Sequence, residues 1–156
     1  MSREIRRVPE YWLHPKNSYD RYIPLLGGDY QEDLEEWEAR EDKEGESRPE
    51  KHEYMPDWPE EELTHIMMYE TTSEGTPKSP AFPKDKPEEL ARWLVAQKVT
   101  SFGPRTSSYE SWLNMITGSG YACGMVISGG VVRTGVDDLY QDKLKEETDG
   151  DNKQSE

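Results

Sequence analysis

The sequence predicts an α+β fold, with a small antiparallel sheet and about three helices in a single domain over residues 1–136. Three observations predict this class. Short runs rich in β-branched and aromatic residues are typical of strands, and two segments combine helix start signals with apolar residues at helical spacing. A Gly-Gly pair between two β-branched runs indicates a hairpin. We also expect an acidic helix and loop insertion over residues 28–62 and a disordered acidic tail over residues 137–156.

Strands are predicted at four places. Residues 3–8 alternate enough to form a short strand, and residues 63–71 are the best strand candidate in the middle of the chain. Residues 123–127 and 131–134 flank a Ser-Gly-Gly turn and predict the hairpin. We expect residues 75–83 to lack regular structure, because the prolines there cannot donate to a strand ladder.

Two helices are predicted in the second half of the chain. One starts at Asp85-Lys86-Pro87-Glu88, which has the form of a capping box with proline in the first turn. The other starts at Ser107-Ser108-Tyr109-Glu110 and has the same form of start signal. Trp93 and Trp112 lie on the apolar faces of these helices, so we expect both rings to be buried.

The composition limits the size of the core. Of 156 residues, 32% are hydrophobic and 33% charged, and the mean hydropathy is −1.06. Five Trp and nine Tyr supply the burial that aliphatic residues do not. The single cysteine excludes an intramolecular disulfide and is typical of a reducing compartment. No apolar run approaches the ~20 residues of a membrane span, so we expect a soluble cytoplasmic protein that does not bind membranes.

The net charge of −14 is concentrated in one segment. Residues 28–62, here called the acidic arm, hold 16 acidic and four basic residues. The tail after residue 136 holds eight acidic and three basic residues, whereas the rest of the chain is close to neutral. Such a surface repels nucleic acid and attracts basic protein surfaces. The alternative interpretation is a solvated acidic helix that only maintains solubility.

The first part of the arm predicts a helix that presents carboxylates to solvent. Asp29 can cap a helix that runs to about Arg40, with Leu34 on its apolar face. Large rings mixed with carboxylates are typical of interfaces, where rings supply short-range energy and charges set the association rate. The alternative is that each ring anchors the arm to its own core. The predicted partner-binding residues are Glu32, Asp33, Glu35, Glu36, Trp37, Tyr54 and Trp58.

No catalytic, cofactor or metal site is predicted. Paired-carboxylate catalysis needs two carboxyl groups in a shaped cleft, which an exposed acidic arm does not provide. The three histidines (His14, His52 and His65) and Cys123 do not have the spacing of metal ligands. We expect His65 to be a strand histidine and Cys123 to be buried. Residues 71–77 are rich in hydroxyls but lack the lysine spacing of a phosphate-binding loop, and we interpret them as a structural turn.

Several motifs together resemble a family of small acidic proteins encoded by bacteriophages and prophages. The similarity spans about residues 3–136, and the family's usual ending is shorter than this chain. The family has no established catalytic residues, so the resemblance implies only a phage origin and action inside a bacterial cell. The motifs are Arg6-Arg7-Val8-Pro9 with Trp12 and His14-Pro15, Tyr22-Ile23-Pro24-Leu25, Tyr54-Met55-Pro56-Asp57-Trp58, Met68-Tyr69-Glu70-Thr71-Thr72-Ser73-Glu74-Gly75-Thr76-Pro77 and Glu89-Leu90-Ala91-Arg92-Trp93-Leu94.

These observations favour a protein that acts by binding rather than by catalysis. The leading hypothesis is a phage-encoded inhibitor that binds a basic surface of a host defence or nucleic-acid-handling complex, with its acidic arm imitating a nucleic-acid backbone. The second hypothesis is a phage accessory protein that binds a replication or recombination enzyme without inhibiting it. A small enzyme is the third. The sequence does not identify the partner or the oligomeric state.

Overall fold

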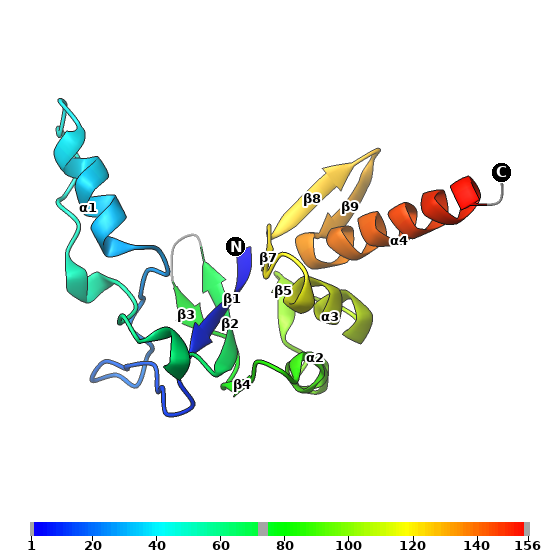
Figure 1. Ribbon diagram of the computed structural model, residues 1–156, viewed down its shortest axis with the longest axis horizontal. Helices are drawn as coiled ribbons and strands as arrows, with labels where there is room; N and C mark the ends of the chain where they lie inside the picture. The colour runs from blue at the N-terminus through cyan, green and yellow to red at the C-terminus, as the bar shows by residue number, and fades with distance from the viewer. Residues whose placement is uncertain (1, 72–74, 155–156) are drawn as a thin grey trace.

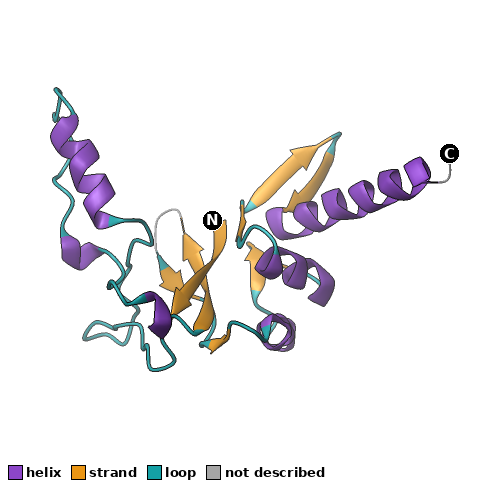
Figure 2. Ribbon diagram, in the orientation of Figure 1, coloured by secondary structure: helices purple, strands orange, loops and turns teal. Residues whose placement is uncertain are grey.

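The structure is a computed structural model that describes residues 2–71 and 75–154. It confirms the α+β class: four α-helices and three antiparallel sheets are present among the described residues (Figures 1 and 2). In chain order the elements are β1 (Ser2–Val8), α1 (Tyr30–Ala39), β2 (His65–Thr71), β3 (Thr76–Pro77), β4 (Phe82–Pro83), α2 (Pro87–Ala96), β5 (Thr100–Phe102), β6 (Arg105–Thr106), α3 (Tyr109–Thr117), β7 (Tyr121–Ala122), β8 (Met125–Ser128), β9 (Val131–Thr134) and α4 (Gly135–Gln154).

The main sheet is built around the first strand. Strand β1 pairs with β2 over its whole length, from Ser2 opposite Thr71 to Val8 opposite His65. The other edge of β1 pairs with β7, and the other edge of β2 pairs with the short strands β3 and β4. The expectation that residues 75–83 lack regular structure was therefore wrong for two short pieces. Their prolines lie in edge strands, where a missing N–H is tolerated.

Both faces of the main sheet are covered. On one face, Ile66 and Met68 of β2 pack with buried residues of α2, α3 and α4, including Leu90 and Trp112. On the other face, Met67 and Tyr69 pack with rings and side chains from long loops. Because successive strand residues point to opposite faces, a run of five buried residues in β2 requires this two-sided cover.

The predicted hairpin and the two later helices form, with local corrections. Strands β8 and β9 are joined by Gly129 and Gly130, which both have positive φ. Helix α3 is capped by Ser108, but α2 is preceded by Lys86, with Pro87 in its first turn and no side-chain cap. Trp112 is fully buried as expected, whereas Trp93 is only half-buried.

Two further expectations were wrong. Cys123 is exposed: its backbone packs against Gly135, where an added Cβ would overlap the Cys123 carbonyl oxygen, but its side chain lies at the surface. The tail is helical through residue 154. Val136 is fully buried, and Thr134 accepts a hydrogen bond from the Asp137 amide, so the core itself starts helix α4. Figure 1 shows α4 at the end of the molecule opposite to α1.

Candidate functional site

Helix α1 forms as predicted at the start of the acidic arm. Asp29 caps it, with one carboxylate oxygen accepting hydrogen bonds from the amides of Gln31 at 2.8 Å and Glu32 at 3.2 Å. Acidic residues in the first turn are favoured by the helix dipole. Leu34 is buried and fixes the rotation of the helix. The predicted start and the predicted apolar face of this helix are both confirmed.

The rotation set by Leu34 places three glutamates on the opposite face. Glu32, Glu35 and Glu36 are exposed, and Glu35 and Glu36 lie three and four positions after Glu32, so each is a neighbour of Glu32 on the helix surface. Neither Lys nor Arg forms an ion pair with them within the described part of the chain. This face, which we call the glutamate face, is the densest unpaired negative surface that α1 presents.

Asp33 and Tyr54 have a different role from the glutamate face. Tyr54 is 7% exposed, and its hydroxyl donates a hydrogen bond to Asp33 Oδ2 at 2.6 Å. This bond, with a smaller contribution from burial, raises the pKa of Tyr54 to about 12. The Tyr54 ring also meets the Tyr30 ring edge-on, with 5.5 Å between centroids. Both residues therefore hold α1 in place, and their direct contact with a partner stays a prediction.

The backbone near Tyr54 ties the arm to the segment before it. The Leu26 amide donates to the Glu53 carbonyl at 2.8 Å, and the Met55 amide donates to the Leu26 carbonyl at 2.9 Å. Gly27 follows directly, and a Cβ there would lie 2.7 Å from Arg6 Nε. The Arg6 guanidinium also lies over the Tyr69 ring and donates to the Leu25 carbonyl at 2.8 Å. The base of the arm is thus fixed to the sheet by a buried arginine.

The two predicted tryptophans of the arm also make contacts within the protein. The Trp37 ring is half-buried, with the Lys43 ammonium 4.4 Å from its centroid. Its indole N–H has no hydrogen-bond partner among the described residues. Trp58 is half-buried and meets Trp12 edge-on, with 4.9 Å between centroids, on the loop-covered face of the sheet. Both rings keep one accessible part, so their contribution to binding stays a prediction.

The loop between β1 and α1 carries exposed large apolar side chains that sequence reasoning did not select. Leu13 is 86% exposed, Tyr19 83% and Tyr11 66%. Tyr11 donates a hydrogen bond to Glu62 at 2.9 Å, which joins this loop to the end of the arm. The only signal in the sequence was a cluster of large apolar residues among turn-forming ones. Whether such rings are buried depends on tertiary contacts that no local pattern encodes.

A buried hydrogen-bond network joins this loop to strand β2 of the main sheet. Trp12 Nε1 donates to the Tyr69 hydroxyl at 3.1 Å, and this hydroxyl lies 3.0 Å from His14 Nδ1. His14 Nε2 contacts the Ile23 carbonyl, so a neutral His14 with its proton on Nε2 satisfies every group. Burial lowers the pKa of His14, which favours this neutral form. The role of His14 is therefore structural.

A second polar cluster lies on the main sheet. Arg3 and Glu70 are buried opposite each other on β1 and β2, and Lys78 Nζ lies 2.9 Å from Glu70. Burial alone would raise the pKa of Glu70, but Lys78 and Arg3 together lower it. No three His, Cys, Asp or Glu side chains within residues 2–71 and 75–154 are placed to hold a metal ion. Part of the predicted turn at residues 71–77 lies outside the described residues.

None of the helices in the described chain is both long enough and apolar enough to cross a membrane. Comparison with protein-family models, curated proteins and solved structures finds no match to this chain.

Proposed function

We propose that this protein binds a basic groove on a nucleic-acid-handling or defence complex of a bacterial host and blocks it by imitating a nucleic-acid backbone. The observation that carries the proposal is the glutamate face: Glu32, Glu35 and Glu36 are exposed together on a helix whose opposite face is buried. The phage origin in this proposal comes from the sequence resemblance alone.

The position of the arm supports binding better than it supports a purely solubilising role. Solubility needs only charge, in any conformation. Here a buried tyrosine, a buried arginine and two backbone hydrogen bonds hold the arm in one place. Ordered charges can match a fixed pattern of Lys and Arg on a partner, and clustered charges increase the association rate through steering.

The experiment tests whether the position of the glutamates on α1 matters for binding, and not only the net charge of the protein. The protein is expressed in bacterial cells with an affinity tag, and proteins that co-purify are identified by mass spectrometry. Competition between the purified protein and labelled DNA or RNA for each partner is then measured. The test variant changes Glu32, Glu35 and Glu36 to lysine. The control variant changes Asp142, Glu146 and Glu147 of α4 to lysine, which alters the net charge equally at the other end of the molecule.

The proposal predicts that the α1 variant loses competition and that the α4 variant keeps it. Wild-type binding should also weaken steeply with salt, because exposed charges act over a Debye length of about 8 Å at physiological ionic strength. Simultaneous binding of the protein and nucleic acid to the partner would instead favour a non-inhibitory accessory role. Equal losses in the two variants would show that only net charge matters, and the proposal would be wrong.

A further inference from the structure

The loop over residues 10–23, here called the tyrosine loop, is held by Trp12 and His14 and presents other large side chains to solvent. It presents the side chains of Tyr11, Leu13 and Tyr19, and a third ring, Tyr22, is 43% exposed. Single exposed apolar residues need no explanation, but several within one short loop are typical of an interaction surface. The loop itself has no net charge to contribute, because it contains two acidic and two basic residues.

The tyrosine loop is held in one shape. Lys16 and Tyr22 form an antiparallel bridge, and the Asn17 side chain accepts hydrogen bonds from the amides of Tyr19 and Arg21 at 2.9 and 3.1 Å. Asp20 has a φ of 60°, which completes the tight turn at the tip. Below the turn, His14 contacts both the Tyr69 hydroxyl and the Ile23 carbonyl. Ring positions that are fixed in advance lower the entropic cost of binding.

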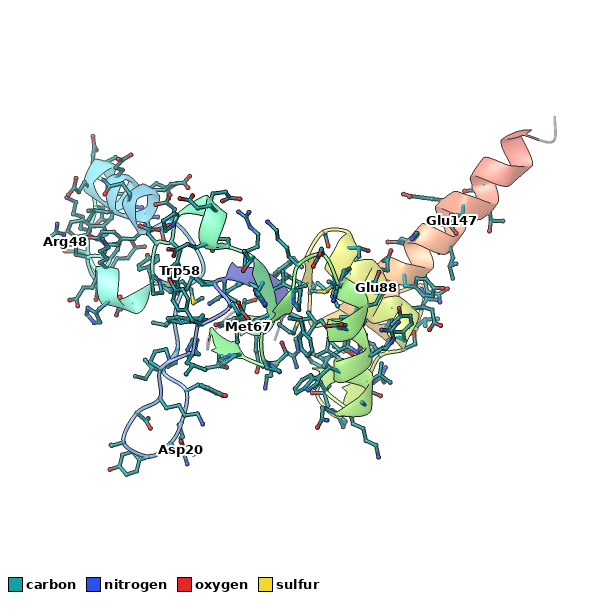
Figure 3. The ribbon with its side chains drawn as sticks, turned by 60° about the horizontal axis from the view of Figure 1, so that its bottom comes forward. Asp20, Arg48, Trp58, Met67, Glu88 and Glu147 are labelled. Carbon is teal, nitrogen blue, oxygen red and sulfur yellow. The ribbon has the colours of Figure 1, made fainter. Side chains whose placement is uncertain are left out.

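The tyrosine loop and the acidic arm project from the same end of the molecule. In Figure 3, Asp20 at the loop tip and Arg48 in the arm lie on the side away from Glu88 and Glu147, with Trp58 where the two segments meet. Two contacts join them: the Tyr11 hydroxyl with Glu62, and the Trp12 ring with the Trp58 ring. The end of the molecule opposite α4 therefore carries ordered carboxylates on the arm and exposed aromatic rings on the loop.

The combination of charge and rings fits one kind of nucleic-acid groove better than another. Grooves for single strands combine basic residues that follow the backbone with aromatic side chains on which bases stack. Duplex grooves contact mainly phosphates, and bases inside a duplex offer no free face. Exposed tyrosine rings can replace stacked bases only in a groove of the first kind.

The charge spacing of α1 agrees with this choice. The helix has 10 residues, five of them acidic. At about 1.5 Å per residue it is about 15 Å long, which gives one negative charge per about 3 Å. Along the axis of B-form DNA, one strand carries one charge per about 3.4 Å, and the two strands together carry one per about 1.7 Å. The helix thus has about the charge density of one strand and about half that of a duplex.

We infer that the groove this protein occupies is one that binds single-stranded nucleic acid, with the tyrosine loop taking the place of bases and the acidic arm the place of phosphates. This inference rests on the proposed function and specifies its partner. It assigns to Leu13 and Tyr19 a contact role, since their side chains are more than four-fifths exposed and make no hydrogen bond within the described residues.

The test uses two resins that carry the same DNA sequence, one single-stranded and one double-stranded. Bacterial extract is loaded on both, and the purified full-length protein is added as competitor. Proteins released from each resin are identified and quantified by mass spectrometry. The test variant carries Leu13→Ala and Tyr19→Ala. The control variant carries Ile127→Ala and Val131→Ala, which truncate exposed apolar residues of the β8–β9 hairpin at the other end of the molecule.

The wild type should release proteins from the single-stranded resin and not from the double-stranded resin. The test variant should release them at least 30-fold less efficiently, which is the loss expected for a ring at the centre of an interface, and the control variant should match the wild type. Equal release from both resins, or a test variant as effective as the wild type, would overturn this inference and leave the proposed function standing. No release from either resin would reject the proposed function itself.

Discussion

The hydrogen bond between Tyr54 and Asp33 gives the sharpest test of how the acidic arm is held. Tyr54→Phe keeps the ring and removes only the hydroxyl that lies 2.6 Å from Asp33 Oδ2. A hydrogen bond to a charged acceptor is worth about 1.5–3 kcal/mol in a buried setting, and the partly exposed Asp33 brings this to about 1–2 kcal/mol. Only the arm depends on this bond, so the loss should appear as local opening of α1.

Hydrogen exchange measures this opening directly. A loss of about 1–2 kcal/mol corresponds to about 5- to 30-fold faster exchange of the protected α1 amides, with the amides of β1 and β2 unchanged. Tyr30→Phe is the matched control, because Tyr30 lies against the same ring and no hydrogen bond is formed by its hydroxyl among the described residues. Unchanged exchange in α1 of the Tyr54→Phe protein would refute the anchoring role.

The same bond predicts a dependence on alkaline pH. The pKa of Tyr54 is raised from 10.0 to about 12 by Asp33, so folding favours the neutral phenol. Its contribution to stability is complete below pH about 10 and is lost as the pH rises toward about 12. The pKa values of Tyr69 and Tyr11 are also raised, by burial and by the hydrogen bond to Glu62 respectively, so in an absorbance titration of tyrosinate Tyr54 should be one of several tyrosines that titrate late in the wild type. In the Tyr54→Phe protein the late absorbance change should be smaller by the amount that one tyrosine contributes, and an unchanged late amplitude would contradict the assignment.

Three further predictions concern the body of the protein. Burial lowers the pKa of His14 from 6.5, so the contribution of neutral His14 to stability is complete above pH about 6.5 and is lost as the pH falls below that value. Denaturation curves of the His14→Gln protein should lack this pH dependence. Trp112→Ala should cost about 3–5 kcal/mol in chemical denaturation, whereas Trp93→Ala should cost clearly less because Trp93 is half-buried; equal costs would contradict the packing. Removing residues 142–156 should leave the melting temperature within a few degrees, because the side chains described there, through residue 150, are exposed, and a large drop would show that they stabilise the fold.

The sequence predicted those elements whose signals are local. A cap and an apolar face determine where α1 begins and which side it buries, and both can be read from Asp29 and Leu34. The Gly129-Gly130 turn has the same local character, since only residues that accept positive φ fit it. The strand at His65–Thr71 was predicted, but its cover on both faces was not, because half of that cover comes from loops without periodicity.

The tail is ordered further than its composition predicts. Few apolar residues follow residue 136, and low apolar content predicts disorder. The structure starts α4 from the core instead, through the buried Val136 and the half-buried Leu139. Once the first turn is fixed, the following residues continue the helix at little cost, because nucleation is the expensive step. A few tertiary contacts at one end of a segment can thus order a polar sequence.

Some residues of the candidate site hold the acidic arm in place, and others are exposed for contact with a partner. The sequence alone does not separate these two groups. Tyr54 and Tyr19 both lie in polar, turn-rich segments, yet Tyr54 is 7% exposed and Tyr19 is 83% exposed. The difference arises from partners far away in the chain: Asp33 receives the Tyr54 hydroxyl, whereas the turn around Asn17 directs Tyr19 away from the protein. Substitutions at positioning residues should therefore change the stability of the arm before they change binding. Substitutions at Tyr19 and on the glutamate face should change binding while the fold stays intact. If the arm is a binding interface, effects on stability and effects on binding should therefore come from different residues, whereas a solvated acidic surface would show no effect on binding at either set.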